Sequence, residues 1–596
     1  IMKKSHLLTL LTVLFSTINL FAQEIHHELS MPAPETHYFH VETTLKAFEE
    51  EKIILTMPVW SPGSYLIREY PKNVNLVRAK DEKGKTLPIQ KIRKNQWEIE
   101  KGDAKTVIVN YEVYAFELTV RTSFLDLTHG FLNGVNVFMY PEGYKDLGGT
   151  LTIIPHETFE TISAPLEVVK DGFSSDVRSQ TFAFKDFDEL ADSPIEIGNQ
   201  EVFTFTAAGV EHEVAMYGPG NYDVERLKKD MAKIVESTTA VFGNNPNEKY
   251  LFIIHNTNER GGGLEHMNST ALNVNRWTYG PEGYISFLSL VAHEYFHVWM
   301  VKRLRPSVLI DYDYNRENYT DLLWVMEGFT AYYDMLLLRR AGLYSKNQYV
   351  NYLQRTVNWV ERSEGNKVQP VADASFDAWI KAYRPNENSG NSTISYYTKG
   401  GLIAAVLDAM IIKKSKGKKS LDDALKELYQ NYYEKNNVGI TEETLKNTLQ
   451  KYVDEDMEDF FKKYINGTET IPYAKYFDPI GLSVTKHTNS VNEIGITTSY
   501  ENGKLIIKTV KTGSPAKKAG LSPNDEIIAF NGFRVDDKEF SNFTKSLSEG
   551  EVFNVIVSRG NRLMTMDVEM IPSEQIQYIF SFDEANKFGE FWLREE

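Results

Sequence analysis

The sequence predicts a multidomain α+β protein with a β-rich N-terminal domain, a mixed and then mainly helical middle, and a β-rich C-terminal domain. From about residue 24 to residue 205, short alternating segments such as "KTVIVNYEVYAF" are separated by Pro, Gly and Asn, which is typical of strands joined by turns. From about residue 222 the apolar pattern changes to a helical period, and long helices are predicted over 285–464. After "FDPIGLSV" the pattern returns to strands and turns until about residue 570.

Length and composition narrow the class of protein. The 596 residues are enough for about three or four domains, and 42 % hydrophobic with 25 % charged residues is typical of a globular protein. The net charge of -17 argues against nucleic acid or anionic lipid as the main partner, because both bind basic surfaces. The sequence has no cysteine, which excludes disulfides, thiolate ligands and a cysteine nucleophile. Any metal ion must therefore be held by His, Asp or Glu.

Residues 1–22 have the layout of a secretory signal peptide. Lys3 and Lys4 precede an apolar stretch over 7–15 that is too short to span a bilayer, and the small residue Ala22 follows. An N-terminal anchor is the alternative interpretation. No later segment is long and apolar enough to cross a membrane. We therefore expect an exported protein, periplasmic or secreted, with no stable membrane span after signal cleavage.

The strongest chemical motif is "VAHEYFHVWM" at 291–300. It lies in a segment from Tyr284 to Leu304 that lacks Gly and Pro and is apolar on every face, which predicts a buried helix. Positions i and i+4 of a helix share a face, so His293 and His297 can direct two imidazoles to one point, with Glu294 beside them. This is the HExxH pattern of zinc peptidases. Hydrogen-bonded core histidines are the alternative, but chance supplies only about 0.02 such matches in a chain of this composition.

A third metal ligand is predicted on the next helix. A catalytic zinc ion usually takes three protein ligands and one water, and without cysteine the third must be His or a carboxylate. The segment 318–342 is predicted to be a helix that ends with Arg339, Arg340 and Gly342. Its Glu327 lies among apolar residues, where an unpaired carboxylate would be costly, and a metal ion removes that cost. An exposed helical Glu is the alternative.

Together these motifs resemble the glycyl aminopeptidase family of gluzincin zinc metallopeptidases. "WVMEGFTAYY" (324–333) after HExxH is similar to the second ligand helix of gluzincins, and "PVWSPGSYLIREY" (58–70) to the N-terminal signature of the family. "GGGLEHMNS" (261–269) is similar to its substrate strand, and "YYTKGG" (396–401) to its Tyr-bearing motif.

The resemblance covers nearly the whole mature chain and implies a division into domains. The catalytic domain is expected to be thermolysin-like, mixed at first and then mainly helical, and the C-terminal domain to be a PDZ domain. The expected units are a signal peptide (1–22), the N-terminal β-rich domain (23–205), the zinc peptidase domain (206–475), the PDZ domain (476–572) and a C-terminal tail (573–596).

The cofactor expected is Zn²⁺, and roles follow for single residues. Glu294, beside the ligand pair, is placed to act as general base on the attacking water. By resemblance, Tyr397 of the Tyr-x-Lys-Gly motif donates a hydrogen bond to the carbonyl oxygen as it becomes anionic, with Tyr396 as the alternative one residue away. Also by resemblance, Glu265 receives the free α-ammonium group of the substrate.

The glycine-rich stretch that carries Glu265 is expected to form a wall of the substrate site. Consecutive glycines, including Gly263, let a backbone approach a ligand, and an edge strand can pair with an extended peptide. By the same resemblance His266, which stands where several related families have Asn, is expected to contact the substrate together with Glu265 and Gly263. A glycine turn with a surface Glu is the alternative. Thermolysin-type sites often carry an Asp one turn after the Glu ligand, where this chain has Ala331, so the partners of the ligand histidines stay unassigned.

The stretch "KLIIKTVKTGSPAKKAGLSPNDEIIAFNG" (504–532) resembles a PDZ domain. A PDZ groove adds a peptide as an extra strand and binds its C-terminal carboxylate at a loop. "EIGITT" (493–498) is the predicted carboxylate loop, through Gly495 and Ile496, and "PIGLSV" (479–484) is the competing loop. A domain that serves only as a packing partner is the alternative.

These features predict a zinc-dependent aminopeptidase that removes N-terminal residues from peptides. A preference for small residues such as Gly or Ala is implied by the resemblance alone. Two alternatives are a zinc endopeptidase whose PDZ domain recruits protein substrates, and a non-catalytic PDZ adaptor on a peptidase scaffold, which the intact set of four site residues argues against. The expected partners are peptide substrates and a peptide C-terminus at the PDZ domain, not nucleic acid. The sequence leaves the oligomeric state open.

Overall fold

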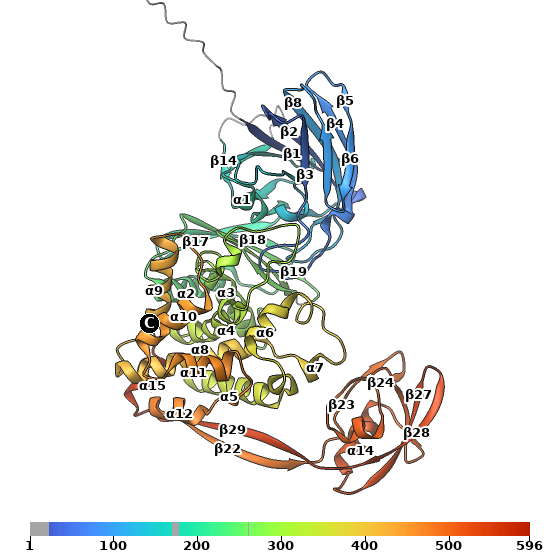
Figure 1. Cartoon of the computed structure of the whole chain (residues 1–596), viewed down its shortest axis with the longest axis vertical. Coiled ribbons are helices and arrows are strands. Elements are labelled where there is room, and N and C mark those ends of the chain that lie inside the picture. The colour runs from blue at the N-terminus through green and yellow to red at the C-terminus, as the bar shows by residue number, and fades with distance from the viewer. Residues whose placement is uncertain (1–22, 170–177, 260, 596) are drawn as a thin grey trace, which may run out of the picture.

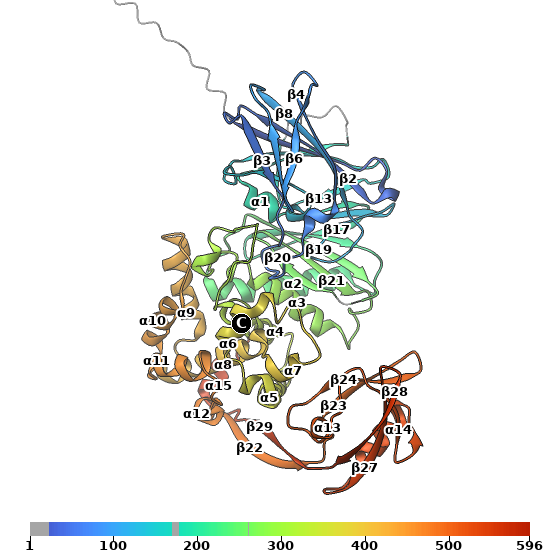
Figure 2. The same cartoon turned by 45° about the vertical axis from the view of Figure 1, so that its right-hand side comes forward.

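The computed structural model describes residues 23–169, 178–259 and 261–595. A β-rich N-terminal domain sits on a central domain of one sheet and many helices, and a second β domain is carried on a two-stranded arm (Figures 1 and 2). The predicted multidomain α+β fold class is thereby confirmed. The predicted signal peptide, residues 1–22, lies outside the described residues. Among the residues that are described, no helix combines the length and apolarity needed to cross a bilayer.

The N-terminal domain consists of three sheets whose strands mostly alternate between buried and exposed side chains. Its elements are β1 (Glu24–Ser30), β2 (Tyr38–Lys46), β3 (Lys52–Thr56), β4 (Val74–Asp81), β5 (Thr86–Leu87), β6 (Ile89–Arg93), β7 (Gln96–Glu100), β8 (Thr106–Tyr114), β9 (Phe124–Leu125), β10 (His129–Asn133), β11 (Tyr140–Pro141), β12 (Gly149–Ile154), β13 (Thr161–Ser163), β14 (Glu167–Val168), β15 (Gln180–Phe184), α1 (Phe187–Ala191) and β16 (Pro194–Gly198). The sheet orders are β14-β15-β12-β1-β2-β8-β4-β5, β13-β16-β10-β9 and β11-β3-β7-β6. Side chains alternate along β2 and β8, so one face packs on the core and the other meets solvent.

The central domain begins with a five-stranded sheet in the order β17-β18-β19-β21-β20. The elements of the sheet and its first helices are β17 (Glu201–Ala207), β18 (Val210–Tyr217), α2 (Val224–Phe242), β19 (Lys249–Thr257), β20 (Gly262–Glu265), β21 (Ser269–Asn275), α3 (Tyr284–Phe296) and α4 (Leu323–Arg340). The strand β20 is the free edge of this sheet and pairs only with β21, antiparallel, within the described residues. The sequence predicts a substrate wall on an edge strand, and β20 is such a strand and lies next to α3.

The remaining helices of the central domain pack behind α4. They are α5 (Lys346–Arg362), α6 (Val371–Phe376), α7 (Ser389–Ser392), α8 (Tyr396–Ser415), α9 (Leu421–Leu428), α10 (Glu442–Tyr452), α11 (Met457–Phe460) and α12 (Tyr473–Phe477). The helix α4 is buried on nearly every face, as its apolar sequence predicts, because α3, α6 and α8 surround it. One continuous apolar core extends from the N-terminal domain into these helices, so the two domains are packed as one body.

The helix predicted from Tyr284 to Leu304 is shorter than expected. The helix α3 ends at Phe296, and the next eight residues form buried turns in which Val301 adopts a positive φ of 66°. These turns are apolar because the surrounding domain buries them, and burial alone gives the same sequence pattern as a buried helix. His297 is consequently the C-terminal cap of α3, still with helical φ and ψ angles.

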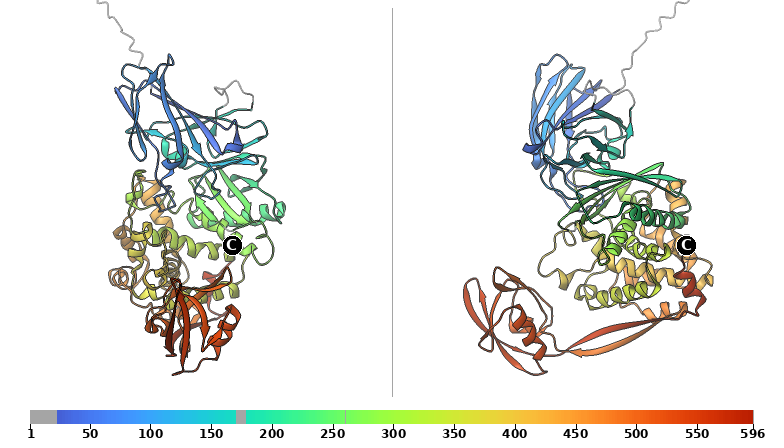
Figure 3. Two further views of the ribbon diagram at one scale, coloured as in Figure 1. Left: turned by 90° about the vertical axis from the view of Figure 1, so that its right-hand side faces the viewer. Right: turned by 180° about the vertical axis from the view of Figure 1, so that it is seen from behind.

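The C-terminal β domain has its own apolar core, separate from the main one. The elements from residue 482 onward are β22 (Leu482–Val491), β23 (Ile496–Glu501), β24 (Lys504–Val510), α13 (Pro515–Ala519), β25 (Glu526–Phe530), β26 (Phe533–Arg534), α14 (Asp537–Ser546), β27 (Val552–Arg559), β28 (Arg562–Glu569), β29 (Ser573–Phe582) and α15 (Lys587–Trp592). The strands β22 and β29 pair antiparallel over their full length and form the arm. The domain lies at the opposite end of the molecule from the N-terminal domain (Figure 3).

The last residues of the chain return to the central domain. Residues 573–596, predicted as a tail, contain β29 and α15, and α15 packs against α8. The side chain of Trp592 is 1 % exposed, and its indole Nε1 donates a hydrogen bond to the Tyr332 hydroxyl at 2.8 Å. The C-terminal β domain is therefore tethered at both ends to the central domain.

The predicted carboxylate loop of the PDZ domain lies at the start of β23. Gly495 has a φ of 81°, and a Cβ atom there would lie 2.2 Å from the Ser514 Cβ, so only glycine fits. Ile496 is the first residue of β23, which is the edge strand of the sheet. The competing loop, which contains Gly481, lies instead where the arm leaves the central domain, beside Asn586. The geometry thus favours the Gly495 loop.

The C-terminal β domain touches the central domain near the Tyr-bearing motif. The Asn391 amide on α7 donates to the Val510 carbonyl at 2.9 Å, and its oxygen accepts from the Thr512 N–H at 2.8 Å. Asn391 lies four residues before Ser395, the N-cap of α8. One polar side chain therefore holds the C-terminal domain close to the helix that begins with Tyr396.

Candidate zinc site and substrate cavity

Three side chains from two adjacent helices meet at one point. His293 lies near the end of α3, His297 caps it, and Glu327 lies on α4, which packs along α3. The Glu327 Oε2 atom is 3.5 Å from His293 Nε2 and 3.2 Å from His297 Nε2. The structure therefore brings together the three residues that the sequence predicts as metal ligands.

The spacing of these donors suits a zinc ion. Ligand atoms that share a tetrahedral zinc ion at about 2.0–2.1 Å lie about 3.3 Å from one another. The two measured separations bracket that value. Glu327 is ionised in this setting: burial raises its pKa, but His297 and His293 outweigh burial and lower the pKa to about 2. Two imidazoles and an ionised carboxylate are a donor set that zinc prefers.

Each ligand histidine is oriented through its second ring nitrogen. His293 Nδ1 lies 3.2 Å from Asp334 Oδ2, and His297 Nδ1 lies 3.3 Å from the Met300 carbonyl oxygen. A donated Nδ1–H fixes the tautomer that leaves Nε2 free for a metal. Asp334 was not predicted from the sequence. The spacing could have indicated this residue, because Asp334 follows Glu327 by seven residues, which is two helical turns. Both carboxylates therefore lie on one face of α4.

Glu294 is buried beside the ligands, facing the substrate strand. A Cβ atom on Gly263 would lie 2.2 Å from Glu294 Oε1, so the glycine in β20 is required for the carboxylate to fit. Burial raises the pKa of Glu294 to about 7, against the lowering effect of His293 and His297. The carboxylate is thus placed close to the ligands with the proton affinity of a base that works near neutral pH.

Glu265, at the end of β20, is also buried and shares the cavity with Glu294. Single ligand atoms of Glu265, Glu294 and His297 all lie within 4.8 Å of one another. The Glu265 Oε1 atom has no hydrogen-bond partner within the described part of the chain. Two carboxylates so close together in a buried site attract a cation, and one of them has an oxygen free to receive it.

The N-terminal domain contributes directly to this cavity. Gly63, in the stretch 58–70, has a φ of 83°, and a Cβ atom there would lie 2.4 Å from Glu265 Oε1. The Gly63 carbonyl accepts a hydrogen bond from the Tyr383 hydroxyl at 3.3 Å. From the sequence, this stretch was predicted to belong to the N-terminal domain and was given no part in the site. No short-range pattern could have shown it, because the contact joins different domains.

The two candidate tyrosines differ in their access to the cavity. Tyr397 lines it, with its ring centroid 6.2 Å from that of His293. Tyr396 is 1 % exposed and lies behind, its ring stacked on that of Tyr397 with centroids 4.7 Å apart. Because Tyr396 is absent from the cavity wall, the geometry favours Tyr397 as the hydrogen-bond donor.

His266 is placed differently from what the sequence predicts. Its side chain is 2 % exposed, and its Nδ1 atom lies 3.0 Å from Asp192 Oδ1. The Lys302 ammonium group contacts the same oxygen at 2.7 Å. His266 is not part of the cavity wall, so the prediction that it contacts substrate is corrected: Asp192 holds its imidazole in an ion network behind the strand.

The residues described above surround one cavity of about 260 Å³. The predicted residues that line it are Gly263, Glu265, His293, Glu294, His297, Glu327 and Tyr397. Five more were not foreseen, namely Gly63, Arg121, Ser289, Leu290 and Asp334. The cavity therefore combines a metal-ligand set, a buried base, a phenol and charges of both signs.

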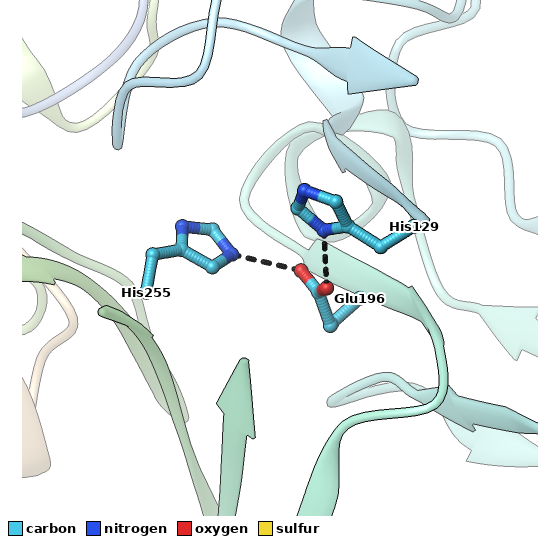
Figure 4. Close-up of side chains that lie close together, drawn as sticks. All are labelled: His129, Glu196 and His255. Atoms are coloured by element: carbon cyan, nitrogen blue, oxygen red, sulfur yellow. Dashed lines mark hydrogen bonds and ion pairs between the residues drawn. The ribbon is translucent and has the colours of Figure 1, made fainter. Parts of the chain in front are cut away.

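A second cluster of two histidines and a glutamate lies elsewhere, between the N-terminal and central domains. His129 on β10, Glu196 on β16 and His255 on β19 are fully buried and point toward one another (Figure 4). His129 Nδ1 lies 2.7 Å from Glu196 Oε1, and His255 Nε2 lies 2.8 Å from Glu196 Oε2. These are hydrogen-bond distances, and each histidine uses a different carboxylate oxygen. The cluster is a hydrogen-bonded link between the two domains.

Family models match three parts of the chain. The model of the Peptidase M61 N-terminal domain matches residues 26–199, and the model of M61 glycyl aminopeptidase matches residues 286–403. The PDZ domain model matches residues 480–570. The catalytic match includes the two helices that carry the three candidate ligands.

Known proteins resemble the chain over different shares of its length. The crystal structure of an aminopeptidase N family protein from Idiomarina loihiensis is 30 % identical, with a TM-score of 0.89, and the match covers 96 % of this chain and 100 % of that one. An M1 zinc metallopeptidase from Deinococcus radiodurans is 13 % identical, with a TM-score of 0.48, over 76 % of this chain and 95 % of its own. The carboxy-terminal processing protease CtpB of Bacillus subtilis is 36 % identical over 97 residues, 15 % of this chain, and the chain spans only 20 % of that protein.

Proposed function

This chain belongs to the M61 glycyl aminopeptidase family of metallopeptidases, and on that premise we propose that it is a zinc-dependent aminopeptidase. It removes N-terminal residues, small ones such as Gly and Ala, from peptides. The observation that carries this proposal is the buried Glu265 carboxylate, which lies in the same cavity as the candidate ligands and has an oxygen without a partner among the described residues. The preference for small residues rests on the family alone.

His293, His297 and Glu327 would hold the zinc ion, which when bound supplies Lewis acidity that polarises a carbonyl group and lowers the pKa of water. Glu294 takes the proton of the attacking water. Burial raises its pKa to about 7, so the carboxylate is a stronger base than an exposed glutamate. The Tyr397 hydroxyl donates a hydrogen bond to the substrate carbonyl oxygen, and this bond strengthens as the oxygen becomes anionic.

Glu265 makes the reaction an exopeptidase reaction. A free N-terminus is an ammonium group, and the Glu265 carboxylate, which has an oxygen without a partner among the described residues, stabilises it. An N-acetylated peptide has no positive charge and would leave the Glu265 carboxylate buried without a counter-ion. Binding of the ammonium group also fixes the distance to the scissile carbonyl, so cleavage falls after the first residue.

Two further parts of the proposal concern location and recruitment. We propose that the protein is exported, because residues 1–22 have the pattern of a signal peptide. We also propose that the PDZ domain binds a peptide C-terminus at Gly495 and Ile496. The support for this is the position of the loop directly before the edge strand β23, where a peptide strand could be added.

The decisive experiment compares a free Gly- or Ala-aminoacyl chromogenic substrate with its N-acetylated analogue, with and without a chelator. We expect the parent enzyme to cleave only the free-amine substrate and to lose that activity with the chelator. Glu265→Ala should weaken its turnover by about 1.5–3 kcal/mol, the range for a hydrogen bond to a charged group, with zinc retained.

The exposed Glu248 of the same domain supplies the matched control, and Glu248→Ala should behave as the parent does. Equal cleavage of the free and acetylated substrates by the parent would reject the aminopeptidase and favour a zinc endopeptidase that receives its substrates through the PDZ domain.

A further inference from the structure

A positive side chain from the N-terminal domain enters the active-site cavity. Arg121 lies in the segment between β8 and β9 and is held by its backbone. Its N–H donates to the Thr119 hydroxyl at 3.1 Å, and its carbonyl oxygen accepts from the Tyr70 hydroxyl at 2.9 Å and from the Asn136 amide at 3.2 Å. These three hydrogen bonds fix the backbone position of Arg121. The fold of the N-terminal domain thereby directs the side chain into the cavity.

The guanidinium group of Arg121 uses only part of its N–H donors within the described residues. Its Nη2 donates to the Gly263 carbonyl oxygen at 3.2 Å, while its Nε is buried and has no partner within the described residues. No ion pair of Arg121 with a carboxylate is found in that part of the chain either. The Glu265 and Glu294 carboxylates in the same cavity act on this guanidinium through their charge. Neither is paired with it directly, and a guanidinium is rarely buried unless it is paired. The cavity therefore offers a place for an anion.

The contact with Gly263 also limits how far a peptide can run along β20. The edge strand offers outward carbonyl groups to an extended substrate, but the one at Gly263 is already taken by Arg121. A peptide that starts with its ammonium group at Glu265 meets this obstacle two residues along the strand. Two residues of an extended chain span about 6.6 Å, and this rise is the same for the strand and for an extended substrate. The Arg121 side chain at Gly263 therefore lies where the second residue of the substrate ends, which is the C-terminus of a dipeptide.

We propose that Arg121 binds the C-terminal carboxylate of the substrate and that the preferred substrates are dipeptides. This inference rests on the proposed aminopeptidase function and names its substrate class. Glu265 takes the positive end of the zwitterion and Arg121 takes the negative end, and both side chains line the same cavity. The scissile carbonyl then lies between them, beside Glu294, which packs against Gly263.

The test compares Ala-Ala with Ala-Ala-amide, which differ only in the charge at the C-terminus. We expect the parent enzyme to prefer the free acid by at least about tenfold in kcat/KM, the effect of one charge-assisted hydrogen bond. In Arg121→Gln that ratio should fall to near one. Arg121→Lys keeps a positive charge and should restore part of the preference. The ratio isolates recognition of the carboxylate, because a merely structural role would affect both substrates equally.

The control is Arg78→Gln, an exposed arginine on β4 of the same domain, which should keep the acid-over-amide preference of the parent. Zinc content and melting temperature are measured for every variant, so that an unfolded protein is recognised. A parent that cleaves acid and amide equally well would overturn the role of Arg121 but leave the aminopeptidase standing. An equal loss on both substrates in Arg121→Gln would also overturn it. A parent that cleaves neither, nor any other free-amine substrate, would overturn the proposed function itself.

Discussion

The described part of the molecule contains two clusters of the same composition, two histidines and a glutamate, and they differ in geometry. In the cluster on α3 and α4 the donor atoms lie 3.2 and 3.5 Å apart, and they face a cavity. In the cluster between the domains the corresponding distances are 2.7 and 2.8 Å. The longer distances in the cavity cluster leave room for a metal ion between the donor atoms. The shorter distances between the domains are those of hydrogen bonds. Residue type alone therefore does not define a metal site.

The use of the second histidine nitrogen separates the two clusters further. In the cavity cluster, Nδ1 of each histidine has its own partner, Asp334 or the Met300 carbonyl, and both Nε2 atoms approach the same oxygen of Glu327. In the cluster between the domains, the outer nitrogens of His129 and His255 have no partner in the described residues, and the inner ones bond to different oxygens of Glu196. Oriented outer nitrogens are the mark of metal ligands.

The sharpest way to break this comparison is to remove one histidine from each cluster. His297→Ala should lose the zinc ion and all measurable peptidase activity, because two protein ligands seldom hold catalytic zinc. His129→Ala should keep about one zinc per chain and lower the melting temperature, because it leaves the Glu196 carboxylate buried without one of its two donors. Metal analysis, activity and thermal unfolding of the two variants measure all three effects.

Both variants remove one imidazole, so each serves as the control for the other. Two zinc ions per parent chain, with one lost in His129→Ala, would show that the second cluster is also a metal site. The distances between donor atoms would then not distinguish the two clusters.

Asp334 offers a smaller test of the cavity cluster. Asp334→Asn keeps the size of the side chain but weakens the hydrogen bond that orients His293. We expect a loss of about 10- to 100-fold in zinc affinity or activity, the usual cost of removing such a partner. Titration with a competing chelator and kcat/KM at saturating zinc measure the two. Asp321→Asn, an exposed change shortly before α4, is the control. Unchanged zinc affinity and unchanged kcat/KM in Asp334→Asn would mean that the bond does not orient the ligand.

The sequence allowed prediction of those parts of the site that depend on local geometry. His293 and His297 are one helical turn apart, so a motif in the sequence already places them on one face. Glu327 was found because an isolated carboxylate in an apolar helix needs a partner. Gly63 and Arg121 could not be found in this way, since they come from another domain and meet the site only through packing.

The same limit explains the two errors in the prediction and the cluster that was not foreseen. The end of α3 was missed because buried turns are as apolar as a buried helix. His266 was misplaced because its partner Asp192 is 74 residues away in the sequence. The members of the second cluster are 67 and 59 residues apart, so no spacing pattern connects them. Contacts between distant strands are set by the register of the sheets, which the sequence pattern does not specify.

The smallest expected effect concerns the pH dependence of the second cluster. Burial raises the pKa of Glu196, but His129 and His255, by their charge and hydrogen bonds, outweigh burial and hold it below its usual value. A carboxyl group with a lowered pKa in the folded state stabilises the protein above its unfolded pKa of about 4.3, and this stability is lost as the pH falls.

Glu196→Gln cannot ionise and lacks this contribution. At pH 7 the variant should be less stable than the parent by about 1–3 kcal/mol, since a buried charged hydrogen-bond partner is replaced by a neutral one. The difference in melting temperature between parent and variant should therefore persist from pH 7 to about 5 and shrink as the pH falls below about 4.3. The exposed control Glu157→Gln should follow the parent throughout. The comparison of the two proteins cancels the other acidic groups, which titrate in both. A difference that does not shrink below about pH 4.3 would show that Glu196 is not held as a carboxylate by its two histidines.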